Sequence, residues 1–115
     1  MGNINSVTVS GNLTADCTKK KAGETPLVEF SVAVNEFRKD KEQYVNFFDC
    51  VLFGKRAQGL ADYLVKGMKV AIKGHLRQDR WESEAGKRSK VVIIVDEVEV
   101  ITPKKQDNEA DEIPW

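Results

Sequence analysis

The sequence YVNFFDCVLF at residues 44–53, followed directly by GKRAQGLADYLVKG at residues 54–67, decides the fold class. The first segment is rich in aromatic and β-branched residues and predicts a strand. In the second segment apolar residues recur at helical spacing, and Gly67 is suited to end a helix, so we expect one helix over residues 55–66. A strand followed by a single helix therefore stands near the middle of the chain.

Strand patterns lie on both sides of this unit. We expect further strands at residues 4–13, 27–37, 68–81 and 89–101. Gly11 marks a bend or bulge in the first of them, and turns are expected at residues 21–26 and 82–88. Five strands with one helix between the third and the fourth is the order of an OB-fold, a five-stranded Greek-key barrel, so the predicted class is all-β. A β-sandwich, which normally has seven strands or more, is the weaker alternative.

At 115 residues the chain has room for one domain. We expect residues 1–102 to form it and the polar, charged residues 103–115 to be a disordered acidic tail. No apolar run approaches the roughly 18 residues of a membrane span, and the N-terminal segment lacks the apolar core of a signal peptide. The prediction is a cytoplasmic protein without membrane contact. Cys17 and Cys50 show no metal-ligand spacing, so we expect reduced thiols and no zinc site.

The net charge is zero, but the charges are unevenly distributed. Residues 106–115 sum to −4 and the rest of the chain to +4. Residues 66–90 contain eight bases and three acids. The neutral total therefore hides a basic region and an acidic end.

Two large aromatics occupy strand positions whose parity is otherwise polar. Phe37 and Trp81 share their strand faces with charged and polar residues, and side chains alternate faces along a strand. Exposed rings among cations favour the stacking of nucleic-acid bases. On the strand at residues 44–53 both faces are apolar, so parity alone leaves Phe47 and Phe53 open between core and surface.

The candidate binding surface combines four rings for stacking with seven cations for phosphate contacts. The rings are Phe37, Phe47, Phe53 and Trp81, and the cations are Lys66, Lys69, Lys73, Arg77, Arg80, Lys87 and Arg88. The alternative is that the rings belong to the core and the cations to an ordinary solvated face.

The segment VVIIV at residues 91–95 is apolar at every position, whereas a half-exposed strand should alternate. Either both of its faces are covered within the barrel, or a second subunit covers one of them. The sequence favours self-association without excluding an unusually hydrophobic core strand.

The acidic end finishes in an aromatic residue. Its last five residues are Asp111, Glu112, Ile113, Pro114 and Trp115. Such a peptide suits a partner protein with a basic-rimmed apolar pocket. A purely solubilising tail is the alternative, but it has no use for a terminal indole.

Several segments resemble the bacterial and phage-type single-stranded DNA-binding protein family. They are VSGNL at 9–13, VLFGK at 51–55, ADYLVKG at 61–67, GHLRQDRW at 74–81 and the acidic end in Ile-Pro-aromatic. The resemblance covers nearly the whole chain in order. It implies an OB-fold homotetramer that binds and protects single-stranded DNA without sequence preference in replication, recombination and repair. It also implies no catalysis and no cofactor.

The resemblance further implies roles for individual residues. It assigns base stacking to Phe37, Phe47, Phe53 and Trp81, and the recruitment of replication and repair proteins to residues 111–115. The chain departs from the family pattern in three ways. Family members often have tryptophan at the positions of Phe37 and Phe47 and a base at Asp49, and a long Gly/Gln/Pro-rich linker usually precedes the tip.

Other function classes fit the sequence less well. His75 is the only histidine and no nucleophile motif or phosphate loop accompanies it, so we do not expect an enzyme. The main alternative is an OB-fold protein-interaction or primosome accessory module with weaker single-strand binding, which would give no reason for the acidic Pro-Trp end. A cold-shock-like RNA-binding domain would be shorter and would lack the helix.

Overall fold

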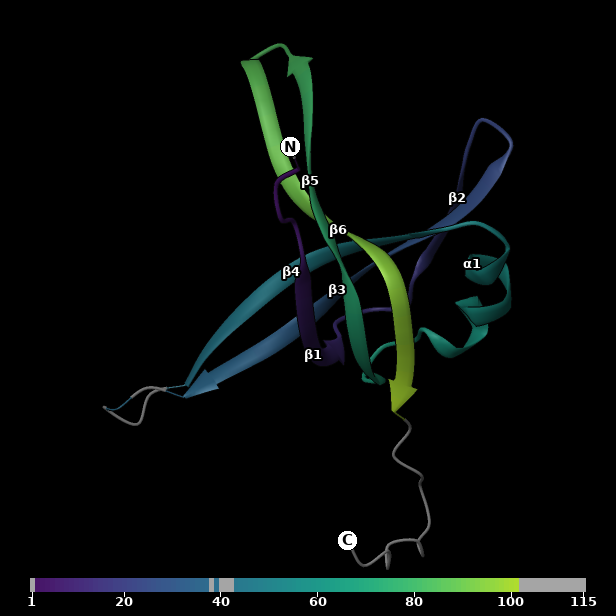
Figure 1. Ribbon diagram of the computed structural model, residues 1–115, viewed down its shortest axis with the longest axis vertical. Helices are drawn as coiled ribbons and strands as arrows, with labels where there is room; N and C mark the ends of the chain where they lie inside the picture. The colour runs from purple at the N-terminus through teal and green to yellow at the C-terminus, as the bar shows by residue number, and fades with distance from the viewer. Residues whose placement is uncertain (1, 38, 40–42, 102–115) are drawn as a thin grey trace, which may run out of the picture.

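In the computed structural model, which describes residues 2–37, 39 and 43–101, the strands form one sheet that closes on itself as a barrel (Figure 1). The elements are β1 (Val7–Leu13), β2 (Thr18–Ala22), β3 (Thr25–Phe37), β4 (Gln43–Phe53), α1 (Lys55–Leu60), a 3₁₀ turn (Ala61–Tyr63), β5 (Lys69–Ser83) and β6 (Gly86–Ile101). The strand order is β1-β5-β6-β4-β3-β2, and a further pairing of β1 with β3 closes the ring. The pairing of β4 with β6 is parallel, whereas the others are antiparallel. The predicted all-β OB-fold is confirmed.

β2 lies where the sequence predicted no strand. It pairs with β3 through a two-residue turn between Ala22 and Thr25, and Gly23 in that turn has a φ of 67°. A positive φ at this position is what tight hairpin turns require and glycine supplies. All five residues of β2 are exposed, so no hydrophobic alternation marks it as a strand. The barrel ring itself uses the five predicted strands.

The helix is shorter than predicted. α1 ends at Leu60 and continues only as the 3₁₀ turn, so the predicted end at Gly67 is wrong. Gly59, in the last turn of α1, disfavours continuation because glycine is among the weakest helix formers. Gly67 instead lies in the connection to β5 with a φ of 88°. Among the described residues, no helix combines the length and the apolar character needed to cross a membrane.

Two glycines allow strands to approach each other closely. A Cβ on Gly11 would collide with the carbonyl oxygen of Ala33, and one on Gly74 with that of Ile94. The pairing of β1 with β5 passes through Gly11 without a register shift, so Gly11 serves the contact of β1 with β3 instead of a bulge. The register shift lies in the pairing of β5 with β6, where Lys73 pairs with Glu97 and Gly74 with Val95, so Asp96 of β6 is the extra residue.

The barrel interior holds the main hydrophobic core. Side chains from all five ring strands meet there, and residues of the helical segment close one end. Its largest fully buried members are Val28, Val32, Cys50, Leu52, Leu64, Val70 and Ile72. Ala57 and Ala61 bring the helical segment against this cluster. Burial of these apolar side chains supplies most of the driving force for folding.

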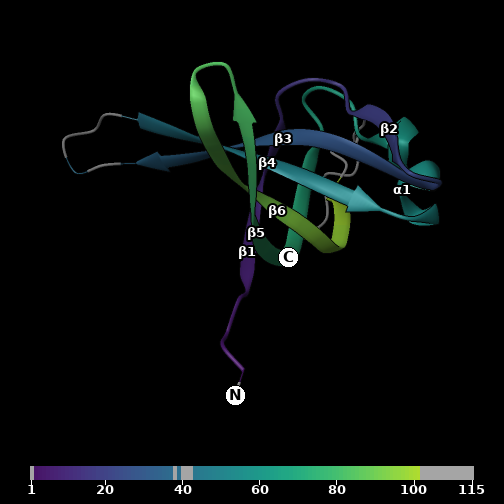
Figure 2. The same ribbon diagram turned by 90° about the horizontal axis from the view of Figure 1, so that it is seen from above.

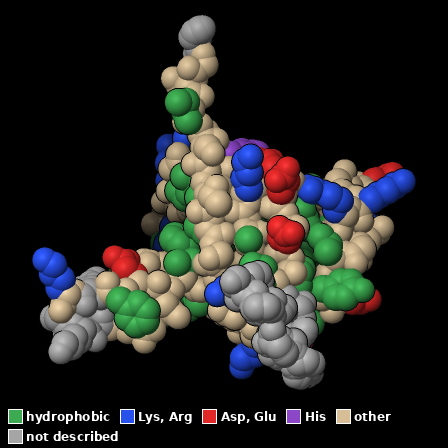
Figure 3. Space-filling model, turned by 60° about the horizontal axis from the view of Figure 1, so that its bottom comes forward, with side chains coloured by type: hydrophobic (Ala, Val, Ile, Leu, Met, Phe, Trp, Pro, Cys, Tyr) green, Lys and Arg blue, Asp and Glu red, His purple; other side chains and the backbone are tan. Residues whose placement is uncertain are grey.

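Hairpins project beyond the barrel, among them the β2–β3 hairpin (Figure 1). The distal parts of β3 and β4 form one arm, and those of β5 and β6 form another (Figures 1 and 2). Figure 3 shows hydrophobic side chains exposed on the β3–β4 arm, at the left of the view. The arms carry large side chains, such as Phe37, Phe47 and Trp81, that are not part of the barrel core. The predicted tail at residues 103–115 lies outside the described residues.

Candidate nucleic-acid interface

A groove of about 600 Å³ crosses the outer face of β3 and β4. Its floor is formed by outward side chains of these strands, and its walls by the β1–β2 connection and β2 on one side and by β5 and β6 on the other. The floor residues are Leu27, Glu29, Ser31, Asp49, Val51 and Phe53; the walls include Thr14, Asp16, Thr18, Arg77, Asp79, Lys90 and Val92. The groove is open to solvent.

A second hydrophobic cluster lies beneath this groove, outside the barrel. Leu27, Val51 and Val92 are buried in it, and Phe53 and Ile94 pack against them. The guanidinium carbon of Arg77 lies 5.9 Å from the centre of the Phe53 ring, within the range of a cation–π contact. The base of the groove is therefore apolar and held in place by packing.

The cluster also answers the question raised by the apolar strand at residues 91–95. Ile93 and Val95 face the barrel core, and Val92 belongs to the outer cluster with only 3% of its surface exposed. Both faces are thus covered within the chain, and Val91 alone of the five stays largely exposed. The hydrophobicity of this strand consequently gives no argument for a second subunit.

The four predicted stacking rings lie on the outer surface at three places. Phe37 and Phe47 are 78% and 65% exposed on the β3–β4 arm. Trp81 is 47% exposed on the β5–β6 arm, and Phe53 lines the groove half-buried. Phe47 and Phe53 share the outer face of β4, opposite the buried Cys50 and Leu52, so the register decides what the sequence left open. Their contact with DNA stays a prediction.

The seven predicted cations are also divided. Arg77 lines the groove. Three more lie with Trp81 in a shallow pocket on the β5–β6 arm: Arg80, Lys87 and Arg88. The remaining three are Lys66, which follows the 3₁₀ turn, and Lys69 and Lys73, which precede the register shift of β5. Lys73 lines a different pocket together with Glu97 and Glu99.

Two cations near the groove were not among the predicted contacts. Lys90 lines the β6 wall, and Lys20 on β2 reaches Glu29 of the floor. The run of lysines at residues 19–21 was visible in the sequence, but without a recognised strand it had no place in the fold. Lys90 stood at the beginning of a predicted strand, and nothing in the sequence indicated which wall it would join.

Among the described residues, the cations at the groove take part in three ion pairs with carboxylates. Lys90 Nζ lies 3.0 Å from Asp49 Oδ2, and Lys20 Nζ lies 3.0 Å from Glu29 Oε1. Arg77 donates to both carboxylate oxygens of Asp79, from Nε at 2.7 Å and from Nη2 at 3.2 Å. The Asp49 carboxylate raises the pKa of Lys90, and hydrogen bonds from Arg77 lower the pKa of Asp79.

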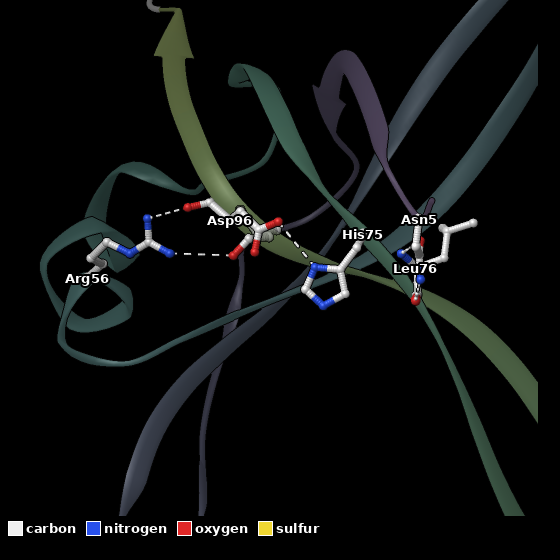
Figure 4. A network of polar contacts seen from close by, with 6 residues as sticks. Asn5, Arg56, His75, Leu76 and Asp96 are labelled. Carbon is white, nitrogen blue, oxygen red and sulfur yellow. Dashed lines mark hydrogen bonds and ion pairs between the residues drawn. The ribbon is translucent and has the colours of Figure 1, made fainter. Parts of the chain in front are cut away.

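The lone histidine takes part in a structural contact. His75 Nδ1 lies 3.2 Å from Asp96 Oδ2, and Arg56 donates to the Asp96 carbonyl at 2.7 Å (Figure 4). Beside them, the Asn5 side chain exchanges two hydrogen bonds of 2.8 Å with the backbone of Leu76. These contacts hold β5, β6, the helical segment and the N-terminal segment together, as expected for a surface histidine. Within the described residues, no group of three or more His, Cys, Asp or Glu side chains is arranged to hold a metal ion.

Comparison with known proteins agrees with this geometry. Residues 4–101 match the family described as the single-strand binding protein family. A single-stranded DNA-binding protein of Treponema pallidum is 43% identical over 88% of this chain and 60% of its own length. Proteins of the same name from Borreliella burgdorferi and Aquifex aeolicus are 38% and 37% identical, over 89% and 96% of this chain and 72% and 82% of theirs. The chain thus spans less than two thirds of the length of the Treponema relative.

Proposed function

Because this chain belongs to the single-strand binding protein family, we propose that it binds single-stranded DNA without sequence preference, as a binding protein and not an enzyme. The observation that carries the proposal is the exposure of Phe37 and Phe47 on one arm and of Trp81 on the other. Bases of a duplex are already stacked on each other, whereas those of a single strand can stack on protein rings. Each such contact is worth about 1–3 kcal/mol and tolerates any base.

The proposed path of the bound DNA strand follows from the positions of these rings. We propose that bases stack on Phe37, Phe47, Phe53 and Trp81 while phosphates contact nearby cations. Arg77 lines the groove and Arg80, Lys87 and Arg88 lie with Trp81, which supports these four as phosphate contacts. Lys66, Lys69 and Lys73 lie elsewhere on the barrel, so they would contact only a strand that continues around it.

We further propose a role in replication, recombination and repair, which is supported by the family and its named relatives. In this proposal the chain acts in the cytoplasm as a homotetramer, and residues 111–115 recruit partner proteins. Light scattering checks the assembly: a mass near the 12.9 kDa of one chain would contradict a tetramer. Deletion of residues 111–115 should abolish partner pull-downs while leaving DNA binding in place, and unchanged pull-downs would make the end a solubilising tail.

A fluorescence titration tests the central proposal. Trp81 and Trp115 are the two tryptophans, so a variant that lacks residues 111–115 reports on Trp81 alone. Oligo(dT) should quench its fluorescence, duplex DNA of equal length should quench it far less, and added salt should weaken binding. The same variant with Trp81→Phe serves as the blank. Absence of quenching, together with absence of an electrophoretic shift, would overturn the proposal.

A further inference from the structure

The groove proposed to bind DNA is not positively charged. Among the described residues that line it, four are carboxylates, Asp16, Glu29, Asp49 and Asp79, and two are cations, Arg77 and Lys90. Three cations without an ion pair among the described residues, Arg80, Lys87 and Arg88, lie in the pocket on the β5–β6 arm. A polyanion that enters this groove therefore meets carboxylates at its floor.

Two of these carboxylates already form ion pairs with cations that would otherwise be available to a phosphate. Asp49 holds Lys90, and Glu29 holds Lys20, each at 3.0 Å. All four side chains are about half-exposed, so DNA can reach them. The backbone fixes both acids at the floor, because Asp49 is in register with Ser31 and Glu29 with Val51 on the outer face of the β3–β4 pair.

We propose that Asp49 and Glu29 are built-in competing anions of the groove, which phosphates must displace from Lys90 and Lys20, and that they thereby limit the affinity and flatten the salt dependence of DNA binding. The inference rests on the proposed function. It concerns how strongly the groove holds a strand, and it assigns these two acids a role beyond stabilising the fold.

The physical argument is one of exchange. When a phosphate replaces Asp49 beside Lys90, the attraction gained is offset by the pair lost and by repulsion between the phosphate and the freed carboxylate. Half-exposed pairs are worth little to stability, so their displacement is feasible. The raised pKa of Lys90, caused first by its hydrogen bond to Asp49, agrees with a real interaction. Asp79 on β5 also faces Lys90 and adds to the repulsion.

The salt dependence distinguishes this exchange from a simple phosphate contact. Neutralising a phosphate of single-stranded DNA releases about 0.7 of a counterion, but a carboxylate freed in the same step takes up cation and offsets that release. Removing the carboxylate should therefore steepen the salt dependence. The gain in affinity should be largest at low salt and should shrink as salt rises.

The test measures the affinity of full-length chains for labelled oligo(dT) by fluorescence anisotropy at several salt concentrations, which does not depend on Trp81 or Trp115. Asp49→Asn should strengthen binding about three- to fivefold at low salt, and steepen the slope of log K against log salt by up to about 0.7. Glu29→Gln should act in the same direction but more weakly, because Lys20 lies on β2 beyond the groove lining. The control is Glu99→Gln, which removes the same charge from β6 at a different pocket and should leave affinity nearly unchanged.

A second variant separates the mechanism from general repulsion. Lys90→Gln should weaken binding, and in that background Asp49→Asn should have lost most of its effect. If Asp49→Asn matches Glu99→Gln, or is equally strong without Lys90, the inference is wrong. Thermal melting confirms that each variant is folded. Failure of the wild-type chain to bind oligo(dT) would instead contradict the proposed function, so the two failures are distinct.

Discussion

The two halves of the β3–β4 strand pair present the same parity to solvent and have opposite environments. Near the barrel, the outward residues Leu27 and Val51 are 8% and 6% exposed because Val92 of β6 packs beside them. On the arm, the outward residues Phe37 and Phe47 are 78% and 65% exposed. Strand parity fixes the face of a side chain, but the neighbouring strand decides whether that face is buried. The barrel half therefore serves stability, and the arm half is free to serve a ligand.

The largest expected effect is on stability and separates the barrel from the arm. Leu52 lies inside the barrel with 0% exposure. Leu52→Ala should lower the free energy of unfolding by about 2–5 kcal/mol, because the change leaves a cavity. Phe47→Ala on the same strand should change the free energy of unfolding by less than about 0.5 kcal/mol, as for other exposed sites. Denaturant unfolding measures both. Comparable losses in the two variants would show that the Phe47 ring is packed in solution, and the contrast between the halves would not hold.

The next effect is on DNA affinity and should have the reverse distribution. Phe37→Ala and Phe47→Ala should each weaken oligo(dT) binding by about 1–3 kcal/mol, through the loss of a stacking surface. Val45→Ala is the matched control, because Val45 shares the outer face of β4 with Phe47 and has no ring. Titration of the three variants at one salt concentration makes the comparison. A loss in Val45→Ala as large as that in Phe47→Ala would point to the shape of the arm and not to stacking.

The sequence predicts which strand face a side chain lies on better than it predicts what packs against that face. Strand parity placed Phe37 and Trp81 outside, and the order of strands and helix predicted the barrel. Strand parity could not assign Phe47 and Phe53 to a face, since both faces of β4 are apolar. Only the pairing of β4 with β3 and β6 shows which face of β4 meets the core. β2 was missed because an exposed strand of polar residues carries no hydrophobic alternation.

Contacts between distant segments were beyond prediction for a different reason. The pairing of Asp49 with Lys90 depends on β6 running beside β4, a parallel pairing that no local pattern announces. The same pairing buries Val92 on the outer face, so of the two explanations that the sequence left open for residues 91–95, coverage within the chain is the one the structure shows. Local sequence specifies elements and faces, whereas the register between remote strands specifies the groove.

The smallest expected effect tests whether water is excluded from the barrel core at Cys50. Cys50 lies on β4 beside Asp49 but faces the core, and burial, with a smaller contribution from the Asp49 charge, raises its thiol pKa from 9.0 to about 12. Because the folded-state pKa is raised, the thiol's contribution to stability is complete below pH 9 and is lost as pH rises toward 12. At pH 10 the loss should be roughly 1.4 kcal/mol. Lysines and tyrosines also titrate in this range, so the measurement is the difference between wild type and Cys50→Ala in denaturant unfolding at pH 8 and pH 10. The free energy of unfolding of wild type relative to that of Cys50→Ala should be smaller at pH 10 than at pH 8. A difference between the two proteins that does not change with pH would mean that water reaches the thiol in the folded barrel.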